Sequence, residues 1–226
     1  MTELTQLYDR VGEAGEPALR SGRYAGEQPP VTGDPRWGLS AVIVPPPDLA
    51  DRLAAIAAEL TRLQRGPHLS YQAEDIHFTV RSLEGFQEQV ERSVVEQYAA
   101  QLRTALGGLR LQVRLRGLVA SPGGVFACGY PNPAIAVLRH RLHEAARDRA
   151  PAIPSVDAKR IRNTFHASLT VLRPPACAEA ALADRVAALR TCDLGEFAPR
   201  QVDLVSYEWS AGSVVMRPLA VVPVGV

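Results

Sequence analysis

The chain has 226 residues, of which 46% are hydrophobic and 22% are charged, and its formal net charge is +1. This length and composition are ordinary for a globular protein with one large domain, or with two lobes that share a core. The nearly neutral charge argues against a long nucleic-acid duplex as the main ligand and leaves a small or single-stranded substrate open.

The N-terminal residues are charged from the start and lack the basic and apolar segments of a secretion signal. No apolar run is long enough to span a bilayer. The three cysteines, Cys128, Cys177 and Cys192, are far apart and odd in number, so they predict neither a metal-binding pair nor a disulfide framework. These features favour a cytoplasmic protein with reduced thiols that does not bind a membrane.

Residues 1–36 are rich in glycine, proline and charge, and no hydrophobic period persists in them. They predict an N-terminal extension or arm, with room for a short helix near Leu4–Val11. The domain itself is expected to occupy residues 37–226.

From residue 37 onward, short apolar runs alternate with helical stripes and turn residues. Apolar or alternating runs indicate strands, and apolar residues at a spacing of three to four indicate helices. Strands are predicted at residues 39–44, 76–83, 109–116, 125–129, 164–172, 202–209 and 214–222. Helices are predicted at residues 48–65, 87–106 and 177–190, and a further helix is expected to begin at Asn132-Pro133.

The strand at residues 109–116 has the clearest pattern, because apolar residues alternate with a polar set. That polar set is Arg110, Gln112, Arg114 and Arg116. One face of the strand is therefore apolar and the other basic, as in a half-buried antiparallel strand. The basic face could follow an RNA backbone, but a solvated outer face of the sheet is the favoured interpretation.

The order of the predicted elements indicates a mixed α+β fold. Turns at residues 121–124 and at Ala211-Gly212 predict two hairpins. Each half of the chain also places helices around one strand that carries a polar motif. This arrangement predicts two lobes related by a pseudo-twofold axis.

The two polar motifs share one form, in which a histidine is followed two residues later by a hydroxyl residue. They are His77-Phe78-Thr79-Val80 and His166-Ala167-Ser168-Leu169. Side chains alternate between the two faces of a strand, so each histidine shares a face with its hydroxyl residue. Burying that face in an ordinary core would leave polar groups unsatisfied. A cleft shared by both strands accounts for the two motifs together.

Paired histidines suit the hydrolysis of a phosphodiester without a metal ion. One histidine can act as the base for the attacking oxygen and the other as the acid for the leaving oxygen. The hydroxyls of Thr79 and Ser168 can donate hydrogen bonds to the non-bridging phosphoryl oxygens. By strand alternation Arg81 shares the face of His77, where it either binds the substrate phosphate or forms an exposed salt bridge.

Both motifs resemble those of the 2H phosphoesterases, which include bacterial RNA 2′,3′-cyclic phosphodiesterases and 2′-5′ RNA ligases. The run from His77 to Gly85 is similar to the first motif of that family, in which a basic residue, a leucine and a glycine follow the histidine and threonine. The second motif has Ser168 where threonine is common. Val171 and Leu172 stand where some members carry an aromatic residue.

The resemblance covers about residues 37–222 and implies a bilobal, pseudo-twofold α+β fold. In this fold two antiparallel sheets flank a central cleft and the helices pack outside. It also implies a cyclic phosphodiesterase of the 2H class, with His77 and His166 as the acid–base pair and with Thr79 and Ser168 beside them. The expected substrate is an RNA end or a small nucleotide with a 2′,3′-cyclic phosphate. No metal or other cofactor is expected, and the protein is expected to be a monomer.

Other functions stay open beside this one. The enzyme could cleave a 2′-5′ linkage or a cyclic-nucleotide signal, or act as a ligase, and a non-catalytic nucleotide-binding module is a third possibility. Intact histidine and hydroxyl groups in both motifs disfavour that third possibility. His140, His143 and Glu144 share a predicted helix and could bind a metal, but their order matches neither His-Glu-x-x-His nor its inverted form. A solvated helix face is the favoured interpretation there.

Overall fold

The computed structural model describes residues 3–148, 151–210 and 213–225. Its helices are α1 (Glu3–Ser21), α2 (Pro47–Leu63), α3 (Arg92–Leu106), α4 (Pro133–Ala145) and α5 (Ala180–Ala188), with short 3₁₀ turns η1 (Ala73–Asp75) and η2 (Ala146–Asp148). Its strands are β1 (Ser40–Ile43), β2 (Leu69–Ser70), β3 (Phe78–Ser82), β4 (Val113–Ser121), β5 (Gly124–Pro131), β6 (His166–Val171), β7 (Asp193–Phe197), β8 (Gln201–Ser210) and β9 (Ser213–Pro223). The expected mixture of helices and strands is confirmed.

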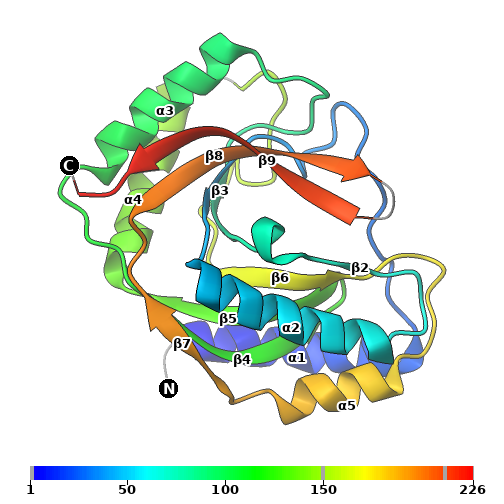
Figure 1. Ribbon diagram of the computed structural model, residues 1–226. Coiled ribbons are helices and arrows are strands. Elements are labelled where there is room, and N and C mark those ends of the chain that lie inside the picture. Colours follow the sequence, from blue (N-terminus) through cyan, green and yellow to red (C-terminus); the bar gives the residue numbers. More distant parts are fainter. Residues whose placement is uncertain (1–2, 149–150, 211–212, 226) are drawn as a thin grey trace.

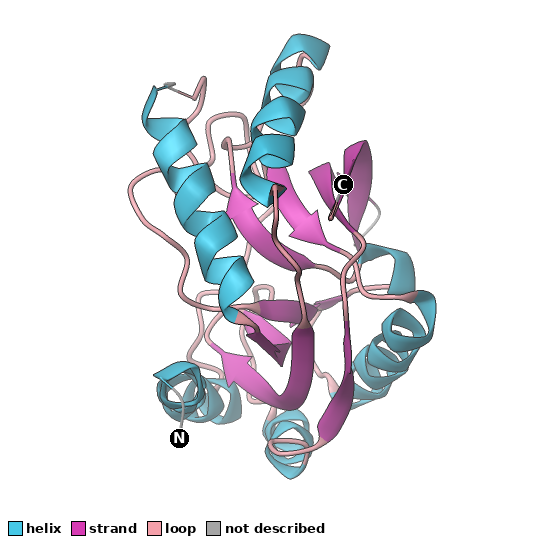
Figure 2. Cartoon of the chain, turned by 90° about the vertical axis from the view of Figure 1, so that its left-hand side faces the viewer, coloured by secondary structure: helices cyan, strands magenta, loops and turns pink. Residues whose placement is uncertain are grey.

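The strands form one curled antiparallel sheet in the order β7-β4-β5-β6-β3-β1-β8-β9, with β2 paired to β6. This order is symmetric about the pair formed by β6 and β3. The unit β1-α2-β3 in one half corresponds to β5-α4-β6 in the other, and each unit ends in a motif strand. The two halves face each other in Figure 1, and Figure 2 shows helices on the outer sides of both. The predicted two-lobed, pseudo-twofold arrangement is confirmed.

The two halves of the sheet are continuous, whereas the resemblance implied two sheets. They join where Phe78 of β3 pairs with Ala167 of β6. The helices also cross between the lobes, because α2 follows β1 but packs on β6, and α4 follows β5 but packs on β3. The motif strands therefore lie at the centre of the molecule and are braced from both sides.

The N-terminal extension packs against the sheet through its helix. The helix α1 is longer than the predicted one and lies beneath β4 and beside α5 (Figure 1). The buried side chain of Tyr8 donates a hydrogen bond to the carbonyl of Gly129. Gly15, which looks like a helix breaker in the sequence, allows close approach, since a Cβ there would lie 2.1 Å from the carbonyl oxygen of Ala120. The domain boundary at residue 36 stays a prediction.

Several element ends differ from the sequence-based expectation. The strand β4 runs from Val113 to Ser121 rather than over residues 109–116, and it forms the expected hairpin with β5. The edge strand β7 was missed, because it is short and contains Gly195 at φ 102°. The second hairpin, β8 with β9, is present, but its predicted turn, Ala211-Gly212, lies outside the described residues.

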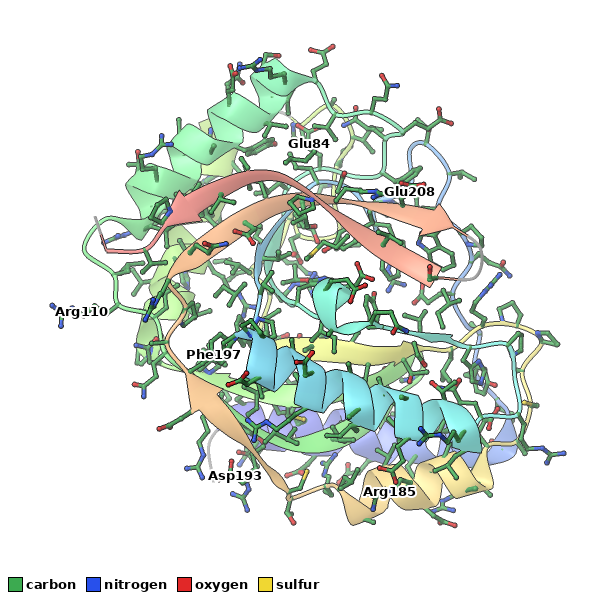
Figure 3. All side chains as sticks on the ribbon, in the orientation of Figure 1. Glu84, Arg110, Arg185, Asp193, Phe197 and Glu208 are labelled. Carbon is green, nitrogen blue, oxygen red and sulfur yellow. The ribbon has the colours of Figure 1, made fainter. Side chains whose placement is uncertain are left out.

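The basic face of β4 is solvated, as favoured. Arg114 and Asp193 form an ion pair 3.0 Å long in which both side chains are more than half exposed. Arg110 points away from the molecule in Figure 3. No helix in the described part of the chain is both long and apolar enough to cross a membrane.

Candidate active site

The register of β3 and β6 brings the two motifs together. Phe78 pairs with Ala167, and neighbouring residues of an antiparallel pair also face each other. His77 therefore lies across from Ser168, and Thr79 lies across from His166. Phe78 and Ala167 themselves point into the core and are fully buried, so the four polar residues share the opposite face.

These four polar residues line one pocket of about 120 Å³. Arg36 and Arg162 also line it, and none of the described residues that line it is an aspartate or a glutamate. A pocket with two guanidinium groups, two imidazoles and several hydroxyls is suited to an anion. The sequence-predicted residues His77, Thr79, His166 and Ser168 are thus in one place.

His77 is fixed in one tautomer. Its Nδ1–H donates a hydrogen bond of 2.7 Å to the backbone carbonyl of Asp75, which ends the turn η1. The lone pair of the neutral ring is therefore on Nε2, and this nitrogen accepts a hydrogen bond of 2.9 Å from the hydroxyl of Tyr207. Burial of the ring, together with the charge of Arg162, lowers the pKa of His77 to about 4.

His166 is held differently. Its ring lies against Phe126 of β5, with 4.3 Å between the ring centres. Its buried Nδ1 has no hydrogen-bond partner among the described residues. Burial, and then the charges of Arg162 and Arg139, lower the pKa of His166 to about 3. Both motif histidines are therefore neutral near pH 7 when the pocket is empty.

Arg81 does not line the pocket, contrary to strand alternation. The pairing of β1 with β3 shifts so that Ala41 faces Arg81 while Val42 faces Thr79. This bulge leaves Val80 without a paired residue on β1 and turns Arg81 to the other face of the strand. There Arg81 is buried and donates a hydrogen bond to the carbonyl of Asp157. The predicted substrate contact of Arg81 has no support from this geometry.

Arg162 is a cation of the pocket that was not predicted from the sequence. Its Nε donates a hydrogen bond of 3.1 Å to Asp157, whose fully buried carboxylate also accepts one from the backbone N–H of Ser82. This ion pair orients the guanidinium at the pocket, where it lowers the pKa of both motif histidines. The available signal was the basic run Arg160-Ile161-Arg162 just before the second motif, which spacing alone could not distinguish from a solvated loop.

The histidine pair on α4 lies elsewhere. The ring of His143 lies 3.3 Å from Arg81, on the side of the sheet away from the pocket. In the described part of the chain, no three histidine, cysteine, aspartate or glutamate side chains group so that they could hold a metal ion.

The low pKa values of the two motif histidines make stability depend on pH. Below pH 6.5 the unfolded chain protonates both histidines, whereas the folded protein does so only near pH 4 and pH 3. We therefore expect the free energy of unfolding to fall as the pH falls from 6.5 to 5, by at most about 1.4 kcal/mol per pH unit for each histidine. Chemical denaturation of the wild type and of the variant H77N/H166N at several pH values measures this slope. Equal slopes in the two proteins would contradict the burial of neutral rings.

No protein-family model and no curated protein sequence matches the chain. Solved structures do match it, and they show that the chain has the 2H phosphoesterase fold, with its curled antiparallel half-barrel. TT0787 of Thermus thermophilus has a TM-score of 0.60 and 20% identity, over 83% of this chain and 97% of that one. LigT of E. coli, in complex with 3′-AMP, has a TM-score of 0.54 and 16% identity, over 83% and 98% of the two chains. A protein described as a phosphoesterase has a TM-score of 0.52 and 16% identity, over 83% of this chain and 98% of that one.

Proposed function

We propose that the protein is a metal-independent phosphodiesterase of the 2H class that opens the 2′,3′-cyclic phosphate of an RNA end or a small nucleotide. The main support is the four-residue face made by His77, Thr79, His166 and Ser168. Two acid–base groups and two hydroxyl donors converge there on a pocket whose charged lining is cationic. This set provides a base, an acid and donors for the phosphoryl oxygens.

His77 is the general base of this proposal. Its Nδ1–H is committed to Asp75, so only Nε2 can take a proton. A water molecule that replaces the hydroxyl of Tyr207 at Nε2 loses its proton to His77 and attacks the phosphorus. Since Tyr207 already donates to that nitrogen, its hydroxyl also keeps the ring in position before the substrate arrives.

His166 is the general acid. The bond between phosphorus and one ribose oxygen breaks as His166 gives that oxygen a proton. In the empty pocket the low pKa of His166 keeps its ring neutral. An anionic phosphate beside the ring favours the protonated form and therefore raises the pKa of His166. Arg162 holds the same phosphate from the loop before β6, and Thr79 and Ser168 donate to its non-bridging oxygens.

The structural neighbours support a nucleotide substrate. LigT is described in complex with 3′-AMP, a nucleoside with a phosphate on its ribose. An opened 2′,3′-cyclic phosphate gives a product of the same kind, with one phosphate on the 2′ or the 3′ oxygen. Another neighbour is described as a phosphoesterase.

Turnover with EDTA present tests the proposal. The substrates are the 2′,3′-cyclic nucleotides and an oligonucleotide that ends in a cyclic phosphate, with 3′,5′-cyclic nucleotides and a 2′-5′ dinucleotide for comparison. We expect the 2′,3′-cyclic substrates to be opened at an undiminished rate in EDTA. Cleavage of the 2′-5′ linkage alone would overturn the cyclic specificity and keep the chemistry. Binding of all four substrates without turnover would support the non-catalytic module instead.

A further inference from the structure

We infer that the N-terminal extension completes a nucleobase-binding subsite beside the histidine pocket, with Trp37 as its aromatic wall and Glu27 as its hydrogen-bond acceptor. This inference rests on the proposed function, because it supplies the part of the substrate that the histidine pocket is too small to hold. The base expected there carries an exocyclic amino group, as adenine, cytosine and guanine do and uracil does not.

A second cavity adjoins the histidine pocket. Its volume is about 250 Å³, roughly twice that of the pocket, which is about 120 Å³. Arg36, Trp37, His166 and Ser168 line both. A ligand whose phosphate lies between the two histidines can therefore extend directly into the second cavity.

The walls of this second cavity suit a flat aromatic ring. Trp37 and Phe126 line it, together with the aliphatic side chains of Val125 and Val171. Any of the bases can stack on an aromatic side chain, because every base has a π-face. The motif strand itself offers no aromatic residue here, since Val171 and Leu172 follow its second motif.

The polar group of this cavity comes from the extension. Glu27 is pinned to the end of β6 by its backbone N–H, which donates a hydrogen bond of 2.7 Å to the carbonyl of Leu172. Its side chain is only 15% exposed and pairs with Arg36 at 2.5 Å. A carboxylate accepts hydrogen bonds from the amino group of a base, as Asp and Glu do from cytosine N4. At the position of the cytosine amino group, uracil carries the carbonyl oxygen O4, which would repel the carboxylate.

Trp37 has a backbone conformation that is unfavourable for a tryptophan. Its φ is 63°, in the left-handed region, which is rare for a bulky residue. Edge contacts to Tyr207 and Trp209 fix the ring, with centre separations of 5.7 and 5.4 Å. The next residue, Gly38, packs so tightly that a Cβ would lie 2.1 Å from the carbonyl oxygen of Gly85. Unfavourable backbone geometry of this kind concentrates at binding sites.

The test compares W37G and E27Q with the control E208Q. Glycine tolerates the left-handed region, so W37G removes the ring without adding strain. Glu208, labelled in Figure 3, forms an exposed ion pair with Arg217 on the strands β8 and β9. It is not among the residues that line either cavity. The substrates are cytidine and uridine 2′,3′-cyclic phosphate, and ribose 2′,3′-cyclic phosphate, which has no base. Circular dichroism and thermal unfolding confirm that each variant is folded.

We expect W37G to lower the ratio of kcat/KM for the cytidine substrate to that for the base-free substrate by about tenfold, mostly through KM. E27Q is expected to reduce the preference for cytidine over uridine, and E208Q to leave both ratios as in the wild type. Equal losses on all three substrates in W37G and E27Q would overturn the subsite.

A binding measurement separates failure of the subsite from failure of the proposed function. Trp37 and Trp209 are the two tryptophans of the chain, so Trp37 is the single tryptophan in W209F, and its fluorescence can be excited separately from that of the tyrosines. Cytidine 3′-monophosphate should quench this fluorescence, and ribose 5-phosphate should not. Quenching without any turnover would uphold the subsite and reject the enzyme. If the wild type turns over all three substrates at equal kcat/KM and W209F shows no quenching, the enzyme is upheld and the subsite is rejected.

Discussion

Replacing His77 or His166 by glutamine is expected to lower kcat for phosphodiester hydrolysis by about 10²–10⁴-fold, the usual contribution of a positioned acid or base. Glutamine keeps a polar side chain of similar length but cannot take up or give a proton. Because the two rings act in one step, we expect the double variant H77Q/H166Q to lose little more than either single variant. Steady-state kinetics with a 2′,3′-cyclic nucleotide in EDTA measures all three.

The matched control is H140Q, which replaces an exposed histidine of α4 that does not line the pocket. It should turn over at the wild-type rate. Wild-type rates in H77Q and H166Q would place the chemistry elsewhere, and a strictly additive double variant would mean that the two histidines act in separate steps.

The sequence was sufficient for the two motif strands, because each combines two independent patterns. Phe78 and Ala167 supply the buried face, and the histidine and hydroxyl residues supply the opposite one. Strand alternation then fixes which side chains lie together, provided that the strand is regular. The neighbouring strands β1 and β5 and the helices α2 and α4 were also predictable, because their apolar residues follow a continuous pattern along the chain.

The sequence failed where the backbone departs from regular geometry. Alternation placed Arg81 beside His77, but the bulge at Val80 reverses its direction. Arg162 and Trp37 lie in irregular segments whose course depends on distant contacts, such as those of Asp157 with Ser82 and of Gly38 with Gly85. Such contacts have no period along the chain, so no local pattern could have indicated them.

One side chain joins both motif strands, and its loss should be the most damaging change to the fold. Arg139 of α4 is 6% exposed. Among the described residues, the acceptors of its guanidinium are all backbone carbonyls. The acceptors are Thr79 and Val80 on β3, and Arg162 and Thr164 before β6, at 2.8–3.0 Å. Burial is the main reason why the pKa of this arginine is lowered to about 10.

We expect R139A to lower the free energy of unfolding by about 3–5 kcal/mol, because it removes four hydrogen bonds to carbonyls that are buried or partly buried. For a chain of this size that corresponds to a fall in Tm of roughly 10 °C. R139K should lose somewhat less, since a lysine ammonium keeps the charge but cannot reproduce the planar fork that reaches four acceptors. Thermal and urea unfolding of the three proteins measures the difference.

The control for this change is R141A on the same helix. Arg141 is exposed and donates hydrogen bonds to the carbonyls of Ala105 and Gly107 at the end of α3. The hydrogen bond to Gly107 is exposed and the one to Ala105 is partly buried. Water can therefore replace much of what the guanidinium supplies, and the loss should be below about 1 kcal/mol. Because Arg139 bonds Thr79 itself and the segment that carries Arg162, R139A should also lose turnover at temperatures where it is still folded. If R139A and R141A unfold at the same temperature and urea concentration, the guanidinium of Arg139 does not align the motif strands. Their own pairing and the packing of Phe78 would then align them.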